Sequence, residues 1–115
     1  MTDLPRRVLE ELREVDARYQ TSVGLRTKVV QRFRWEAMAV LARHEVDPSV
    51  EVFLDVTEVS PGREDVSLFV GTAEEYASVR NGESLVAPLD ERGDVARDLA
   101  EEGRWDEAEA LLRGE

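Results

Sequence analysis

The hydrophobic period of this sequence changes at Asp47–Pro48, and this change restricts the chain to folds that combine helices with a small sheet. Before the break, apolar residues recur every three or four positions, which is typical of amphipathic helices. After it, every second residue from Val50 to Val56 is apolar, which is typical of a β-strand. The residue before a proline is disfavoured in the helical conformation, so the two patterns separate here. We therefore predict an α+β fold.

Two helices are expected before the break, over residues 4–20 and 25–44. The apolar pattern is interrupted at residues 20–24; Gly24 would also suit one bent helix, but two separate helices are our prediction. The apolar face of the first helix consists of Leu4, Val8, Leu12, Val15 and Tyr19. The apolar face of the second consists of Val29, Val30, Phe33, Ala37, Val40, Leu41 and His44.

The alternating pattern continues after a Pro-Gly turn, which predicts an antiparallel β-hairpin of residues 50–57 and 66–71. In an antiparallel hairpin, the residue numbers of every two opposite residues add to the same sum. Val56 faces an apolar partner such as Leu68 only if this sum is even. A three-residue loop, Pro61–Arg63, gives that pairing. The register is therefore expected to follow from this loop.

A short helix and a possible third strand are expected next. Thr72 and Glu75 have the spacing of a capping box, in which each side chain bonds to the backbone N–H of the other residue. This predicts a short helix from residue 72 to about residue 80. Residues 83–88 could add a third strand, which Pro88 would limit to a short edge strand.

The C-terminal residues are expected to form a helical hairpin. Asp90 or Asp94 would cap its first helix, and Gly103 is placed to end that helix in a left-handed conformation. The stretch 99–108 resembles the turn between the two helices of a tetratricopeptide repeat. A stacked array needs three or more repeats and this stretch occurs once, so we predict a single helix pair. Its apolar residues are Val95, Leu99, Ala100, Trp105, Ala108, Leu111 and Leu112.

The chain is strongly acidic, with 15 basic and 26 acidic residues and a net charge of -11. Residues 1–44 carry a net charge of +3 and residues 45–115 a net charge of -14. Such a balance favours solubility and repels bare nucleic acid and anionic membranes. No signal peptide is apparent, and the longest apolar run, Ala37–Ala42, is too short to span a membrane. We expect a single small domain, residues 1–115, in the cytoplasm.

Few catalytic chemistries are compatible with this composition. The absence of cysteine excludes thiol catalysis, disulfides and cysteine-zinc sites in this chain. The single histidine, His44, has no second histidine at a metal-binding spacing and is interpreted as structural. No serine lies in a Gly-x-Ser-x-Gly context, and no glycine-rich loop precedes a helix. We therefore predict no catalytic, metal, cofactor or small-molecule site.

One face of the second helix is the strongest candidate for a functional surface. Trp35 lies there among cationic residues, opposite the apolar stripe, and tryptophan and arginine are enriched at interface hot spots. Another element of the same chain could equally cover Trp35. Two phenylalanines, diagonal neighbours on the outer face of the hairpin, would be covered by helices or by a second copy of the chain. The candidate surface consists of Lys28, Arg32, Trp35, Arg43, Phe53 and Phe69.

Three functional hypotheses follow. The favoured one is a non-enzymatic protein–protein interaction or regulatory module that self-associates, with the acidic half of one copy facing the basic helix of the next. The second is a nucleic-acid-binding module that uses helix 25–44, with a base on Trp35; the net charge makes this partner less favoured. The third is an acidic decoy that occupies the basic groove of a nucleic-acid-binding partner. No membrane partner is expected.

Overall fold

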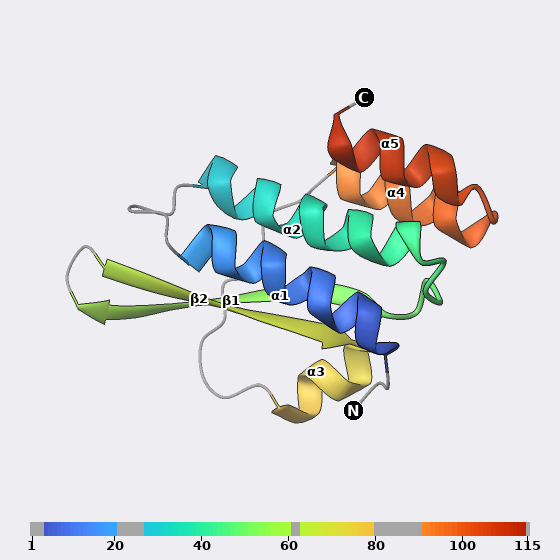
Figure 1. Cartoon of the computed structure of the whole chain (residues 1–115). Coiled ribbons are helices and arrows are strands. Elements are labelled where there is room, and N and C mark those ends of the chain that lie inside the picture. The colour runs from blue at the N-terminus through green and yellow to red at the C-terminus, as the bar shows by residue number, and fades with distance from the viewer. Residues whose placement is uncertain (1–3, 21–26, 61–62, 80–90, 115) are drawn as a thin grey trace.

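The computed structural model describes residues 4–20, 27–60, 63–79 and 91–114, with side chains except at residues 20, 27–30, 55–60, 63–67 and 79. Within these ranges the chain has an α+β fold with five helices and one antiparallel hairpin (Figure 1). The possible strand at residues 83–88 and the cap Asp90 lie outside them. The elements are α1 (Arg6–Gln20), α2 (Thr27–Arg43), β1 (Glu51–Ser60), β2 (Arg63–Gly71), α3 (Ala73–Val79), α4 (Glu91–Glu101) and α5 (Trp105–Arg113).

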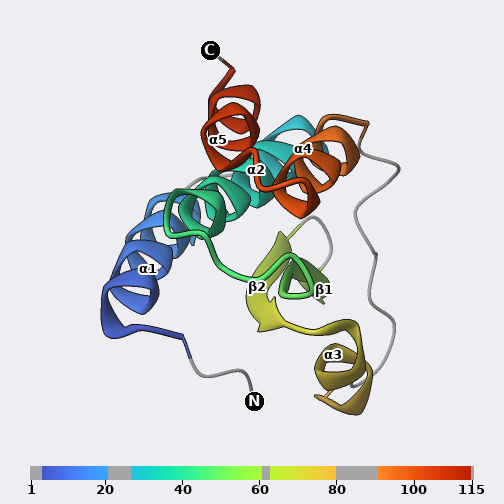
Figure 2. The same ribbon diagram turned by 90° about the vertical axis from the view of Figure 1, so that its right-hand side faces the viewer.

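Helix α2 is the central element, with α1 and the β-hairpin on one side and α4 and α5 on the other (Figure 2). Helices α1 and α2 are separate, as predicted, and they run antiparallel (Figure 1). Their facing sides and the inner face of β1 form the first core, in which Phe33 is fully buried and stacks on Tyr19 with ring centroids 4.8 Å apart. The buried residues of this core are Val8, Leu12, Val15, Phe33, Ala37, Val40, Leu41, Val52 and Leu54.

The hairpin has the predicted faces but a different register. Val56 pairs with Val66 rather than with Leu68, and the last pair before the turn is Ser60 with Arg63, so two residues connect the strands instead of three. With a two-residue connection alone, the residue numbers of opposite residues would add to an odd sum. The apolar residues of one strand would then lie on the opposite face from those of the other. A bulge just before Ser60 adds one residue to β1 and restores the even sum.

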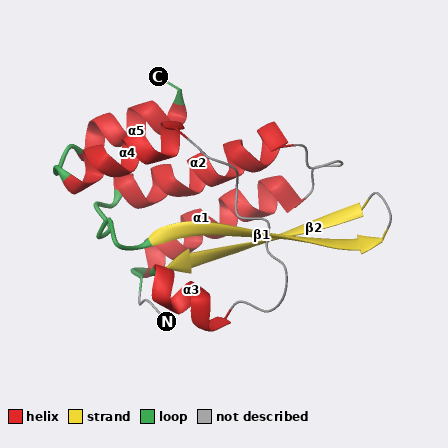
Figure 3. Ribbon diagram, turned by 180° about the vertical axis from the view of Figure 1, so that it is seen from behind, coloured by secondary structure: helices red, strands yellow, loops and turns green. Residues whose placement is uncertain are grey.

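The outer face of the hairpin is covered by α3 of the same chain at the end where β1 begins and β2 ends (Figure 3). Phe53 lies directly opposite Phe69, not diagonally as predicted, because of the shifted register. Tyr76 of α3 stacks on Phe53 at 4.1 Å between ring centroids and lies 5.7 Å from Phe69. The predicted capping box starts this helix, since the Glu75 N–H donates to Thr72 Oγ1 and the Thr72 N–H donates to Glu75 Oε1.

Helices α4 and α5 form the predicted helical hairpin and pack on the second face of α2. Gly103 joins them with a φ of 79°, in the left-handed region. Of the two predicted caps, Asp94 lies inside the first turn of α4, and Asp90 lies outside the described residues. Val95 is 44% exposed. Small residues replace Val95 at the interface because they allow close helix approach. The second core consists of Ala39, Ala42, Ala96, Ala108 and Leu112.

None of the helices in the described ranges is long and apolar enough to cross a lipid bilayer. Every described helix instead contributes a polar side to the surface, and α2 is covered on two sides by other elements. The central position of α2 explains why both of its faces carry apolar residues. It also determines the surroundings of Trp35, which lies on the face toward α4 and α5.

Candidate functional site

Trp35 is covered in part by the helical hairpin of its own chain. The indole packs against the second core, which is built mainly from alanines. The guanidinium carbon of Arg92, in the first turn of α4, lies 4.3 Å from the indole ring centroid, within the range of a cation–π interaction. Trp35 is partly buried, so a portion of the indole stays accessible beside the hairpin.

A groove of about 570 Å³ opens beside Trp35, between α1, α2 and the open end of the helical hairpin, where α4 begins and α5 ends. Four different helices each contribute one arginine to its lining: Arg18, Arg32, Arg92 and Arg113. We call this site the arginine groove. Guanidinium groups are planar, permanently charged donors that match carboxylate and phosphate groups, so the groove suits an anion although the chain is acidic.

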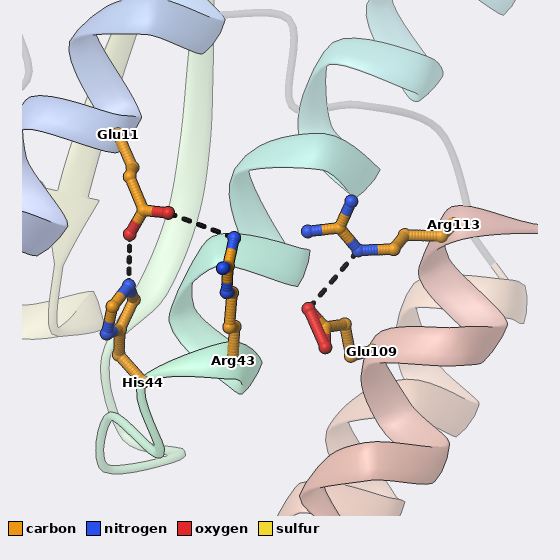
Figure 4. Close-up of polar contacts among 5 residues, drawn as sticks. All are labelled: Glu11, Arg43, His44, Glu109 and Arg113. Atoms are coloured by element: carbon orange, nitrogen blue, oxygen red, sulfur yellow. Dashed lines mark hydrogen bonds and ion pairs between the residues drawn. The ribbon is translucent and has the colours of Figure 1, made fainter.

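The four arginines differ in how far the chain itself neutralises them. Arg113 Nε donates to Glu109 Oε2 at 3.2 Å, and Arg18 Nη2 lies 3.8 Å from a carboxylate oxygen of Glu36 (Figure 4 shows the Arg113 contact). Arg32 and Arg92 form no ion pair or hydrogen bond with any residue in the described part of the chain. Two of the four guanidinium groups in the groove are therefore exposed and have no carboxylate partner among the described residues.

Glu36 is the acidic residue within the groove, and Tyr19 and Arg18 hold it. Burial raises the pKa of Tyr19 to about 12, aided by the hydrogen bond of the phenol to the Glu36 carboxylate and by its negative charge. Glu36 Oε2 is inaccessible to solvent and accepts no hydrogen bond within the described ranges, while Arg18 lies 3.8 Å away. The carboxylate thus lies between a neutral phenol and a cation at the edge of the first core.

The structure places only part of the predicted surface at this groove. Arg32 and Trp35 line it, whereas Arg43 points to Glu11 of α1 at 3.2 Å. The same Glu11 carboxylate contacts the ring of His44, so this histidine helps to join α1 to the end of α2 (Figure 4). The side chain of Lys28 lies outside the described residues. The predicted phenylalanine pair belongs to the separate aromatic cluster under α3.

Three of the four groove arginines were missed by sequence reasoning: Arg18, Arg92 and Arg113. They lie on three helices and share no spacing, and each resembles an ordinary solvated arginine in its own helix. The weak signal was the surplus of arginine over lysine in an acidic chain, which does not say which arginines meet. Only the packing of the helical hairpin on α2 brings them to one site.

The arginine groove has to be interpreted from its own chemistry. Among the residues that the structure describes, no group of three or more acidic or histidine side chains is arranged to hold a metal ion. Comparisons of the chain with protein-family models, with curated proteins and with solved structures found no significant match.

Proposed function

We propose that this protein is a non-enzymatic interaction module that binds an acidic protein surface through the arginine groove and self-associates by this route. The observation that carries the proposal is that Arg32 and Arg92 line the groove with Trp35 and have no carboxylate partner among the described residues. The chain has 26 acidic residues that could neutralise them. Exposed arginines with no carboxylate partner in the described part of the chain, next to a partly buried indole, are the residue combination typical of interface hot spots.

The surroundings of Trp35 favour a protein partner over nucleic acid. Proteins that bind single strands stack bases on open aromatic faces, whereas Arg92 lies over the Trp35 ring. Glu36 also lies in the groove, and the net charge of -11 repels an extended phosphate backbone. An acidic protein surface needs to reach only a few arginines at close range, where local charge complementarity selects the partner.

Sedimentation equilibrium of the full chain at several concentrations tests this proposal. The average mass is expected to rise with concentration and to fall at high salt, because salt screens the charges. The double variant Arg32→Gln/Arg92→Gln is expected to weaken association about tenfold, which corresponds to about 1.4 kcal/mol. The matched control is Arg7→Gln/Arg13→Gln, which removes two exposed arginines of α1 outside the groove and should associate like the natural chain.

A titration separates the classes of partner. Trp105→Phe leaves Trp35 as the only tryptophan, and its fluorescence should change on addition of poly-L-glutamate. The proposal is overturned if the groove variant associates as strongly as its control. It is equally overturned if the chain stays monomeric and Trp35 ignores poly-L-glutamate, or responds only to a single-stranded oligonucleotide.

A further inference from the structure

We infer that the acidic surface entering the arginine groove is the α4–α5 turn of a second copy of this chain, so that copies join head to tail. This inference rests on the proposed function, since it names the partner of the same groove. We use the name acidic turn for four carboxylates around the left-handed Gly103, all of them exposed: Glu101, Glu102, Asp106 and Glu107.

The helical hairpin presents two arginines to the groove at one end and a group of carboxylates at the other, although Glu91, Asp94 and Glu109 also lie near the first end. Its open end contributes Arg92 and Arg113 to the arginine groove, and its closed end is the acidic turn. Residues 101–107 carry a net charge of -3, because Arg104 is the only cation among them. Along α4 the two ends are about 15 Å apart at 1.5 Å per residue. A single chain therefore cannot place its own turn in its own groove.

The four carboxylates of the acidic turn are all exposed. The acidic turn lies at one extremity of the molecule, where α4 ends and α5 begins (Figures 1 and 3). Residues 10–16 of α1 carry a similar charge, but Glu10 pairs with Arg6 and Glu11 is shared by Arg43 and His44. In the acidic turn Arg104 pairs with Glu102 and Glu107, and Arg97 Nε lies 3.6 Å from Glu101, but all three carboxylates stay more than half exposed.

The arginine groove lies at one end of the helical hairpin and the acidic turn at the other. Two copies would therefore meet through different surfaces, which makes the interface heterologous. Such an interface leaves a free groove and a free turn after each addition, so it produces open chains or rings rather than a closed dimer. The expected mass of the natural chain therefore rises beyond that of a dimer as concentration increases. This behaviour distinguishes the inference from a symmetric dimer formed through the same groove.

A complementation experiment on the full chain tests the inference. The groove variant Arg32→Gln/Arg92→Gln keeps its acidic turn, while a turn variant with Glu101→Gln, Glu102→Gln, Asp106→Asn and Glu107→Gln keeps its groove. Each alone is expected to associate about tenfold more weakly than the natural chain. Their mixture is expected to form a 1:1 heterodimer that grows no further, since each partner supplies one working end. Sedimentation velocity measures both the mass and the stoichiometry.

The matched control removes the same amount of negative charge from exposed sites on other surfaces, with Glu10→Gln, Glu14→Gln, Glu74→Gln and Asp98→Asn. This control should associate at least as strongly as the natural chain. If the turn variant associates like this control while the groove variant is weakened, the inference fails and the proposed function stands. If neither variant is weakened, both fail. A mixture that yields no heterodimer, or a natural chain that stops at a dimer, also overturns the inference.

Discussion

The two faces of α2 pack against very different partners. The face toward α1 and β1 is filled by large branched and aromatic side chains, with Phe33 fully buried at its centre. The face toward the helical hairpin is filled mainly by alanines, with Leu112 as the one large buried side chain. A small crevice of about 60 Å³ remains between the hairpin, α2 and β1.

This difference indicates how the molecule divides its stability. Burial stabilises in proportion to the apolar area removed from water, about 25 cal/mol per Å². Alanines let helices approach closely but bury little side-chain area each, and the larger side chains at this junction are only partly buried, so we expect the hairpin to be held less strongly than α1. The arginine groove lies along this weaker junction, because two of its arginines belong to the hairpin. Binding and local opening of the hairpin are therefore expected to be coupled.

The largest effect is expected from Phe33→Ala in the first core. Phe33 is 0% exposed and stacks on Tyr19, so its removal leaves a cavity between α1, α2 and the sheet. The free energy of unfolding should fall by about 3 to 5 kcal/mol, measured by urea denaturation. Because the whole fold depends on this core, circular dichroism and tryptophan fluorescence should report one common transition. A loss below about 1 kcal/mol would contradict the assignment of the main core.

A smaller effect is expected from Leu112→Ala in the second core. The loss should be about 2 to 3 kcal/mol, because a crevice already adjoins this core, its other buried side chains are alanines, and the larger side chains that pack on it are only partly buried. Both tryptophans pack on this core, so their fluorescence should change at a lower urea concentration than the circular dichroism signal. Coincident transitions in this variant would show that the two cores do not differ in the way proposed.

The smallest effect concerns pH and Tyr19 at the edge of the first core. Burial and the hydrogen bond to Glu36 raise the pKa of Tyr19 to about 12, so the folded state holds the phenolic proton more tightly than the unfolded state. The stabilisation is complete below about pH 10 and is lost as the pH rises toward 12. Tyr19→Phe should reduce this alkaline loss, measured as the difference in unfolding free energy between neutral and alkaline pH. An unchanged pH dependence in Tyr19→Phe would contradict the assigned environment.

Most elements of the fold could be predicted because they depend on neighbouring residues. Hydrophobic periodicity identified both N-terminal helices and the strands, and the Thr72–Glu75 capping box and Gly103 marked the boundaries of shorter helices. The register could not be predicted, because β1 contains a bulge before Ser60. With this extra residue, a two-residue connection keeps the apolar residues of both strands on one face, where a regular hairpin would need three residues. The burial of Ala96 in place of Val95 was also missed, since close helix approach selects for small size rather than hydrophobicity.

The sequence by itself determined the α+β class, the apolar faces of the helices and the presence of a tryptophan among cations on α2. These are properties of short segments, and periodicity records them directly. Only the tertiary structure decided which cations accompany Trp35: it replaced Arg43 with arginines from α1, α4 and α5. The positions of exposed arginines follow no hydrophobic period. Whether these arginines lie close together depends on how the helical hairpin packs on α2. The arginine groove is therefore a product of packing rather than of any one segment.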